Sequence, residues 1–309
     1  MVAAALFAAT GLKPVTPESP NAERIEDLYW YIAFWAVVVL LAVAVPLGLF
    51  VYRYRSRGRD RTVEGPQIHG STRLEIAWTL VPVVILLTVT AFTFYKLPGI
   101  TLEDEASASD LRVHVEGRQF YWQYRYPNGV IAIDRLVAPQ DRLVVLDITA
   151  PESDVNHSYW VPGLGGKFDA IPGETTETAF RAEKTGTYEG QCAELCGIQH
   201  AEMLAEVEVL PADEFDRWLE EQAQQQEAGT SDLGEQLFVG ACSKCHGPNG
   251  EGLIGPRLTP ASVGAPQTVA RTVRNGIRTM PAIGEGWDDR QMKALTDYLR
   301  ERFPAEGAQ

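Results

Sequence analysis

Two long stretches without a charged side chain constrain this chain more than any other feature of its sequence. Residues 28–51 are 24 consecutive uncharged positions, equivalent to about 36 Å of α-helix against a hydrocarbon core of ~30 Å. Residues 76–95 form a second stretch, which at about 20 residues is also long enough to cross a bilayer. Tyrosine and tryptophan flank both stretches, as they do at membrane interfaces. The pattern therefore predicts two transmembrane helices rather than two buried core helices.

The segment between the two stretches is short and basic. It holds six arginines: Arg53, Arg55, Arg57, Arg59, Arg61 and Arg73. Because short loops rich in Lys and Arg stay on the cytoplasmic side, we expect a two-pass hairpin over residues 24–96, with the N-terminus and the large C-terminal part outside. Residues 1–23 then form an external lead. Residues 1–11 are apolar and rich in small side chains without a basic start, and they fit either a signal-peptide remnant or an ordinary lead.

Charge is distributed unevenly along the chain. Residues 1–96 carry a net charge of +2 and residues 97–309 carry −16, which together give the −14 of the whole chain. An external part this acidic repels nucleic acid and favours encounter with basic proteins. We therefore expect protein partners and no nucleic acid.

The external part divides into two regions of different periodicity. Residues 97–212 alternate apolar and polar side chains between turn signals, which predicts a β-sandwich or barrel of about 100 residues. A helix is expected from Asp213, followed by a polar stretch, and residues 222–231 are interpreted as a flexible linker of under ~20 Å. Residues 232–309 predict a second, helical domain around a Gly/Pro-rich centre at 247–260.

The densest chemistry in the sequence lies at residues 190–203. This segment holds Cys192, Cys196, His200 and Met203 at spacings of four, four and three, and His157 lies upstream at the expected end of a strand. Thiolates, imidazoles and a thioether form a soft donor set that suits copper. A mononuclear blue-copper site needs one cysteine, so the second cysteine indicates two bridging thiolates and a pair of copper ions.

Two alternatives remain for this segment. In an oxidising external compartment the two cysteines can form a disulfide, which would leave the histidine and the methionine unexplained. Zinc would use the cysteines and histidines but gains little from a thioether.

A second motif, Cys242-Ser-Lys-Cys245-His246, matches the pattern for covalent attachment of a c-type haem. The competing interpretations are a redox dithiol, which needs a βαβ context, and half of a zinc site, which needs another Cys/His pair. We expect Met280 to be the second axial ligand, because His/Met ligation raises the potential as an electron carrier requires. Met292 lies in an amphipathic pattern and is expected to be core.

These motifs resemble known families. The runs DVNHSYWVPGLGGKFDAIPG and GQCAELCGIQHAEM, with LEIAWTLVP in the second apolar stretch, closely resemble cytochrome c oxidase subunit II over residues 24–211. Residues 232–303 resemble a class I cytochrome c. The combination is similar to the caa-type haem–copper oxidases, which implies a two-helix transmembrane hairpin, an all-β cupredoxin Greek-key barrel and an all-α cytochrome c domain in a bacterial inner membrane.

The resemblance also implies ligands. A dinuclear copper centre (CuA) would be bound by His157, Cys192, Cys196, His200, Met203 and the backbone carbonyl of Glu194. The side chain of Glu194 would bind Mg²⁺ at the boundary with subunit I, and Glu75 would lie at the mouth of a proton channel. Quinol oxidases of the same superfamily lack the copper ligands, so their presence implies a cytochrome c donor.

One segment departs from the family. In GRQFYWQY, Phe120 stands where the family usually has the tryptophan at which electrons enter. Tyr121 or Trp122 is then the expected entry point, or the fused cytochrome uses another route. We interpret Tyr124 and Tyr126 as core residues.

The resulting hypothesis is an electron relay. Electrons would enter at the haem, pass to copper and continue to subunit I, where oxygen is reduced and protons are pumped. The expected partners are subunits I and III, and an upstream cytochrome c or a cytochrome bc-type reductase. The alternative is a membrane-anchored haem and copper carrier that serves another reductase.

Overall fold

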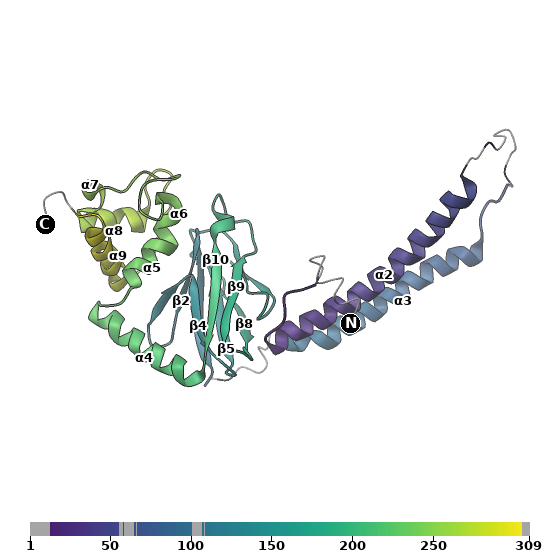
Figure 1. Cartoon of the computed structure of the whole chain (residues 1–309), viewed down its shortest axis with the longest axis horizontal. Helices are drawn as coiled ribbons and strands as arrows, with labels where there is room; N and C mark the ends of the chain where they lie inside the picture. Colours follow the sequence, from purple (N-terminus) through teal and green to yellow (C-terminus); the bar gives the residue numbers. More distant parts are fainter. Residues whose placement is uncertain are drawn as a thin grey trace. The chain divides into compact units, whose positions relative to one another are not determined.

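The computed structural model describes residues 13–55, 58, 65, 67–100, 107 and 109–304. The interpretation of residues 1–11 as a lead or signal remnant lies outside the described residues. The chain separates into two compact units, Arg24–Gly99 and the combination of Met1–Glu23 with Ile100–Gln309 (Figure 1).

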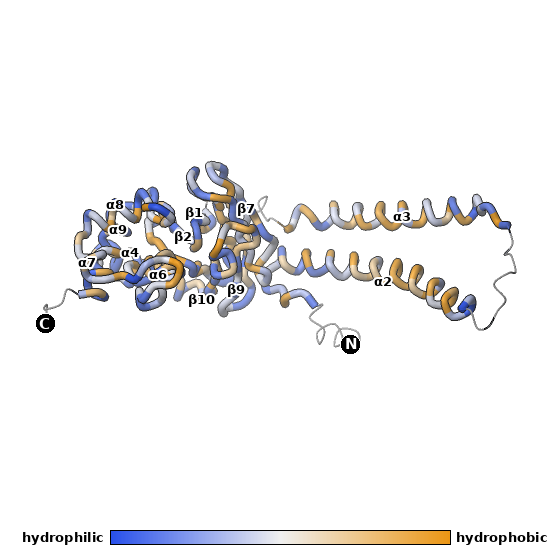
Figure 2. The backbone as a smooth tube through the Cα atoms, turned by 90° about the horizontal axis from the view of Figure 1, so that it is seen from above, coloured by the Kyte–Doolittle hydropathy of each residue, from blue (hydrophilic) through white to orange (hydrophobic). Residues whose placement is uncertain are grey.

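The first unit is a hairpin of two long helices, α2 (Pro20–Tyr54) and α3 (Thr72–Lys96), with a 3-10 turn, η1 (Leu97–Gly99), after the second. Their most apolar windows have mean hydropathies of 2.7 and 2.1, and none of either window is buried. Figure 2 shows apolar residues along both helices. Exposed apolar surface of this extent marks contact with lipid or with a partner, and both helices are long enough to cross a bilayer, which agrees with the two predicted transmembrane helices.

The second unit is built around a β-sandwich of two five-stranded sheets with strand orders β3-β2-β1-β5-β8 and β4-β10-β9-β6-β7. The strands are β1 (Leu111–Arg118), β2 (Tyr121–Arg125), β3 (Ile131–Ile133), β4 (Arg135–Pro139), β5 (Val144–Thr149), β6 (His157–Trp160), β7 (Lys167–Ala170), β8 (Thr176–Phe180), β9 (Gly186–Cys192) and β10 (Leu204–Leu210). One parallel pair occurs in each sheet, β1 with β5 and β4 with β10. The fold is the cupredoxin-like sandwich expected from the sequence.

The alternation that predicted the strands is the burial pattern of the sandwich. Leu111, Val113 and Val115 of β1 face the core, and the residues between them are more exposed. Tyr124 and Tyr126 are fully buried core residues, as predicted. The hydroxyl of Tyr126 donates to the carbonyl of Val137 at 2.7 Å and accepts from its N–H at 2.8 Å, so it ties β2 to the opposite sheet.

Helix α4 (Ala212–Ala228) corrects the prediction of a flexible linker. It continues through most of residues 222–231 and ends at Gly229, whose φ of 71° forms the left-handed cap. Near its end, Gln226 is buried and its amide group accepts from the N–H of Ile131 at 3.0 Å and donates to its carbonyl at 2.7 Å. The linker prediction was wrong because this polar side chain completes the hydrogen bonding of the edge strand β3.

The remaining chain is helical, as predicted. Its elements are α5 (Leu233–Leu237), the π-helical turn η4 (Phe238–Cys242), α6 (Ser243–His246), α7 (Pro260–Val263), α8 (Pro266–Asn275) and α9 (Asp289–Arg302). Helix α9 begins with a reciprocal capping box between Asp288 and Gln291. Met292 is buried in the core of this region, as expected.

Candidate metal and haem sites

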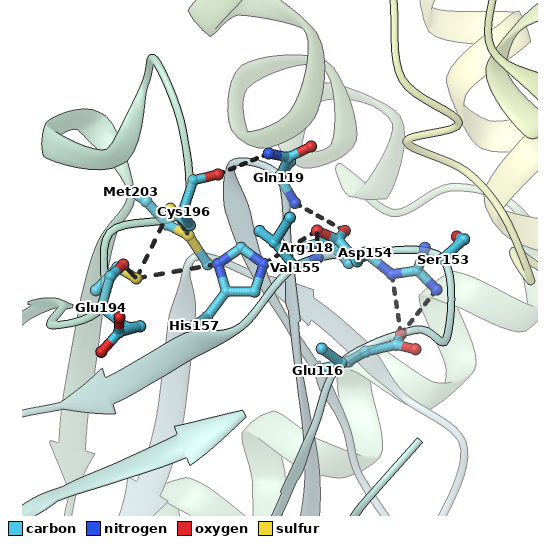
Figure 3. Close-up of polar contacts among 12 residues, drawn as sticks. Glu116, Arg118, Gln119, Ser153, Asp154, Val155, His157, Glu194, Cys196 and Met203 are labelled. Carbon is cyan, nitrogen blue, oxygen red and sulfur yellow. Dashed lines mark hydrogen bonds and ion pairs between the residues drawn. The ribbon is translucent and has the colours of Figure 1, made fainter. Parts of the chain in front are cut away.

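The fold brings the predicted copper ligands together, as Figure 3 shows for His157, Glu194, Cys196 and Met203. Four of them lie at or between the end of β9 and the start of β10, where a loop containing the 3-10 turn η3 (His200–Glu202) connects the strands. The fifth, His157, is the first residue of β6, which pairs with β9. The loop from β9 to β10 therefore positions the four clustered ligands, and the pairing of β6 with β9 positions His157 beside them.

The donor atoms converge around the two thiols. The Sγ atoms of Cys192 and Cys196 are 3.9 Å apart. His157 Nδ1 lies 3.9 Å from the Cys192 Sγ, and His200 Nδ1 lies 3.6 Å from the Cys196 Sγ. Met203 Sδ is 3.8 Å from the Cys196 Sγ, and the carbonyl oxygen of Glu194 is 3.2 Å from the Cys192 Sγ.

These residues fit a copper pair. Both thiols are buried and free, and their separation is about twice the ~2.05 Å of a disulfide. Two bridging thiolates, each approached by one imidazole, form a set that two soft ions can share. The ligand atoms of His157, Cys192 and Cys196 all lie within 4.8 Å of one another, close enough for these residues to hold a metal ion.

The two thiols differ in acidity. The hydrogen bond from Cys196 lowers the pKa of Cys192 to about 3, whereas the same pairing raises the pKa of Cys196. The pairing of the two thiols therefore favours ionisation of Cys192 and opposes ionisation of Cys196. A copper pair would displace the proton of Cys196, because metals bind the thiolate form.

A set of polar residues around the ligands was not predicted. Asp154 Oδ1 lies 3.2 Å from His157 Nε2, which leaves Nδ1 directed toward Cys192. Its other carboxylate oxygen accepts from the backbone N–H of Gln119 at 3.1 Å. The Gln119 side chain in turn donates to the carbonyl of Cys196 at 2.6 Å (Figure 3). The signal that could have found Asp154 is its position three residues before a candidate histidine ligand.

The predicted entry residues Tyr121 and Trp122 are both fully buried. Trp122 points into the sandwich, with its ring edge-to-face on His157 at a centroid separation of 6.1 Å. Tyr121 points the other way, into the core of the helical region, where its hydroxyl donates to the carbonyl of Ile283 at 2.8 Å. The structure therefore places neither residue at an open surface.

The remaining predicted residues of the copper domain and hairpin occupy separate places. The Glu194 side chain is exposed, which leaves its carboxylate available to a partner. Glu75 lies in the first turn of α3, within the compact unit Arg24–Gly99.

The haem motif spans η4 and α6. Cys242 is buried, and burial raises the pKa of its thiol to about 12. His246 Nδ1 lies 2.7 Å from the carbonyl oxygen of Pro256. This contact assigns the proton to Nδ1 and leaves Nε2 free for an iron ion. Both cysteines and the histidine thus fit thioether attachment with a proximal imidazole.

Met280 lies at a tight turn beside this region. Its N–H donates to the carbonyl of Ile277 at 2.9 Å and its carbonyl accepts from the N–H of Ile277 at 3.0 Å. Gly276 has a φ of 68°, and a Cβ there would lie 2.6 Å from the Met280 carbonyl oxygen, so only glycine permits the turn. The side chain packs on the apolar cluster that contains Cys242, which fits an axial ligand of the same haem.

Comparison with known proteins matches three family models to the chain. "Cytochrome C oxidase subunit II, transmembrane domain" matches residues 9–96, and its "periplasmic domain" matches residues 129–210. "Cytochrome C oxidase, cbb3-type, subunit III" matches residues 229–299.

Relatives and solved structures show the same similarity. Cytochrome c oxidase subunit 2 of Alkalihalophilus pseudofirmus is 33% identical over 258 residues, which cover 76% of this chain and 74% of the relative. The subunit 2 of Cereibacter sphaeroides is 32% identical over 267 residues, covering 74% and 84%. The crystal structure of the periplasmic domain of subunit II of cytochrome oxidase of Bradyrhizobium japonicum is 33% identical, covers 38% of this chain and 97% of that one, and has a TM-score of 0.36.

Proposed function

Because this chain belongs to the cytochrome c oxidase subunit 2 family, we propose that it is the electron-entry subunit of its oxidase and carries electrons from a covalent haem c to a dinuclear copper (CuA) centre and on to subunit I. The family membership makes it part of the oxidase complex, with a two-pass membrane anchor, an external copper-type domain and a cytochrome c-type domain. One observation supports the proposed electron path. The candidate copper ligands and the candidate haem-binding residues lie in the same compact unit.

The residues of each set have distinct roles. Cys192, Cys196, His157 and His200 would hold the copper pair through two thiolates and two imidazoles, and Met203 and the Glu194 carbonyl would contribute weaker contacts. Asp154 holds the His157 ring in the orientation that binding needs. When bound, the copper pair and the haem would each accept and donate one electron at a time, without making or breaking covalent bonds.

The residues that would hold the haem also have distinct roles. Cys242 and Cys245 would hold the porphyrin, and the Pro256 carbonyl orients the ring of His246, which would bind the iron. Met280 would be the second ligand, and a His/Met pair would raise the haem potential. Oxygen reduction belongs to subunit I, so none of these residues contacts oxygen.

Partner contacts follow from the exposed groups. We assign the Glu194 carboxylate to a Mg²⁺ at the subunit I boundary and Glu75 to the mouth of a proton channel. The acidic external part, at −16 over residues 97–309, suits a basic upstream cytochrome c or a cytochrome bc-type reductase. Subunit III is a further expected partner within the membrane.

The test is optical and electron-paramagnetic-resonance spectroscopy of the complex purified through a tag on this chain. The proposal predicts a c-type haem spectrum, one unpaired electron shared over two copper ions, and co-purification of a polytopic subunit that carries haem. A chain that purifies with both redox signals but without such a subunit would instead be the stand-alone carrier. A haem signal without the copper pair would contradict the relay.

A further inference from the structure

Lys244 lies inside the haem motif, between the two attachment cysteines, and yet its side chain turns toward the copper domain. Only 15% of that side chain is exposed. Its ammonium group donates to the Asp134 carboxylate at 2.9 Å and to the backbone carbonyl of Phe120 at 2.7 Å. Its own carbonyl accepts from the side-chain amide of Gln199 at 2.8 Å. One residue of the haem motif therefore contacts three residues of the sandwich.

Each of the three contacted residues adjoins the copper site or the segment beside it. Gln199 immediately precedes the ligand His200, and Phe120 immediately precedes Tyr121. The other carboxylate oxygen of Asp134 accepts from the backbone N–H of Trp122 at 2.8 Å, and Trp122 packs on His157. Lys244 thus connects the haem-attachment segment to Gln199, next to the ligand His200. Through Asp134 it also connects that segment to Trp122, whose ring packs on the ligand His157.

The charges at this contact favour the ion pair between Lys244 and Asp134. Burial raises the pKa of Asp134, and the nearby ammonium of Lys244 is the main influence that opposes the rise. The Asp134 carboxylate is only partly shielded from water, with 28% of its side chain exposed, and a charge in such a place is stabilised by an ionic partner. Removing one member of such a pair is costly, whereas preserving the charge retains most of the contact.

Close packing surrounds the polar contact. A Cβ on Gly240 would lie 2.4 Å from Cγ2 of Ile133, so the π-helical turn before the haem motif approaches β3 as closely as a glycine allows. Tyr121, Ile131 and Ile133 of the sandwich belong to the same buried cluster as the cytochrome core. Gln123 accepts from the Gln291 amide at 2.7 Å within that contact. The cytochrome domain is therefore packed on the sandwich and not suspended from a tether.

We propose that Lys244 is a positioning residue that latches the haem-attachment segment onto the copper domain at Asp134, Phe120 and Gln199, so that the cytochrome domain is a resident donor held in one pose. The latch deepens the proposed relay and rests on it. Electron delivery to copper then requires no docking step at each turnover, and an external donor meets the cytochrome domain and not the latched face of the sandwich.

The test compares variants in the intact, detergent-solubilised oxidase. Lys244→Ala removes the ammonium group, Lys244→Arg preserves its charge, and Lys293→Ala is a matched control on an exposed lysine of α9 that pairs within its own helix. Gly240→Leu is a second way to separate the cytochrome domain from the sandwich. It leaves Lys244 intact but forces a side chain between Gly240 and Ile133. Haem c potential and the copper resonance signal are recorded for each variant to show that the two sites are intact.

Two readouts decide the outcome. The first is hydrogen exchange at the N–H of Ile133, which donates to the Gln236 side chain of the cytochrome domain. The second is the viscosity dependence of haem-to-copper electron transfer after photoreduction of the haem. Lys244→Ala and Gly240→Leu are expected to speed the exchange by about tenfold or more and to make the transfer slower and viscosity-dependent, while Lys244→Arg and Lys293→Ala resemble the wild type.

Unchanged exchange in Lys244→Ala overturns the latch, whether or not the transfer slows, because docking would then be independent of the lysine. Failure of Lys244→Arg to restore protection also overturns it. If wild-type oxidase shows no haem-to-copper transfer, the proposed function fails, but hydrogen exchange still decides the latch.

Discussion

Replacement of Tyr121 by phenylalanine tests how firmly the cytochrome domain is docked. The Tyr121 hydroxyl is fully buried, donates to the Ile283 carbonyl at 2.8 Å and accepts from the Trp287 indole N–H at 2.9 Å. The variant keeps the ring and leaves one buried acceptor and one buried donor without this partner. At about 1–3 kcal/mol for each of the two unsatisfied groups, we expect Tyr121→Phe to weaken docking by about 2–6 kcal/mol, a factor of roughly 30 to 20,000.

Tyr126→Phe is the matched control. Its hydroxyl is equally buried and makes the same number of bonds, one donated to the Val137 carbonyl and one accepted from the Val137 N–H, but both lie inside the sandwich. The two variants should therefore lose similar free energy in different places. Tyr121→Phe weakens the contact between domains, and Tyr126→Phe weakens the copper domain itself.

The assay is urea denaturation of the detergent-solubilised oxidase with a separate probe for each domain. Circular dichroism of the haem c absorption follows the cytochrome domain, and the copper absorption follows the sandwich. We expect Tyr121→Phe to move the haem transition to lower urea with a smaller effect on copper, and Tyr126→Phe to do the reverse. Equal movement of both transitions in both variants, or none in Tyr121→Phe, would refute the reasoning.

Three further predictions concern the two sites and the stability of the cytochrome domain. Cys192→Ser should abolish the copper-pair resonance signal while haem c remains attached, because one bridging thiolate is lost; a retained mixed-valence signal would contradict the assignment. Met280→Leu should lower the haem c midpoint potential in a redox titration, since the thioether ligand is removed; an unchanged potential would exclude Met280 as the axial ligand. Burial raises the pKa of Asp288, but a hydrogen bond from the Gln291 N–H and the positive charges of Arg290 and Arg125 outweigh it, so the pKa lies below its ordinary value. The unfolding free energy of the cytochrome domain should therefore fall as the pH drops below about 4, and Asp288→Asn, which keeps the cap, should flatten that fall in urea titrations.

The sequence was informative wherever a periodic or spaced pattern has one physical solution. The hairpin was predictable because residues 28–51 and 76–95 carry no charge, and the sandwich because the β1 pattern alternates with period two. The candidate copper ligands stood out because four of them lie within residues 192–203, and the structure brings their donor atoms together. The candidate haem motif stood out for the same reason, because its two cysteines and its histidine lie within residues 242–246.

Contacts between distant polar residues could not be predicted in this way. Gln226 lies in a glutamine-rich run that is typical of a solvated linker, yet its partner Ile131 is 95 residues earlier in the chain. Lys244 and Asp134 are 110 residues apart. Nothing local distinguishes these side chains from surface residues, because their burial depends on how the two domains pack. The flexible-linker interpretation failed for that reason.

The most direct test of the relay is photoreduction of haem c in the wild-type oxidase, with subunit I blocked by an inhibitor and both redox sites monitored. The relay predicts that the reduced haem reoxidises as the copper pair becomes reduced, with a single rate that is independent of protein concentration. Reduced haem that persists beside oxidised copper, or a rate that rises with protein concentration, would contradict transfer within this chain.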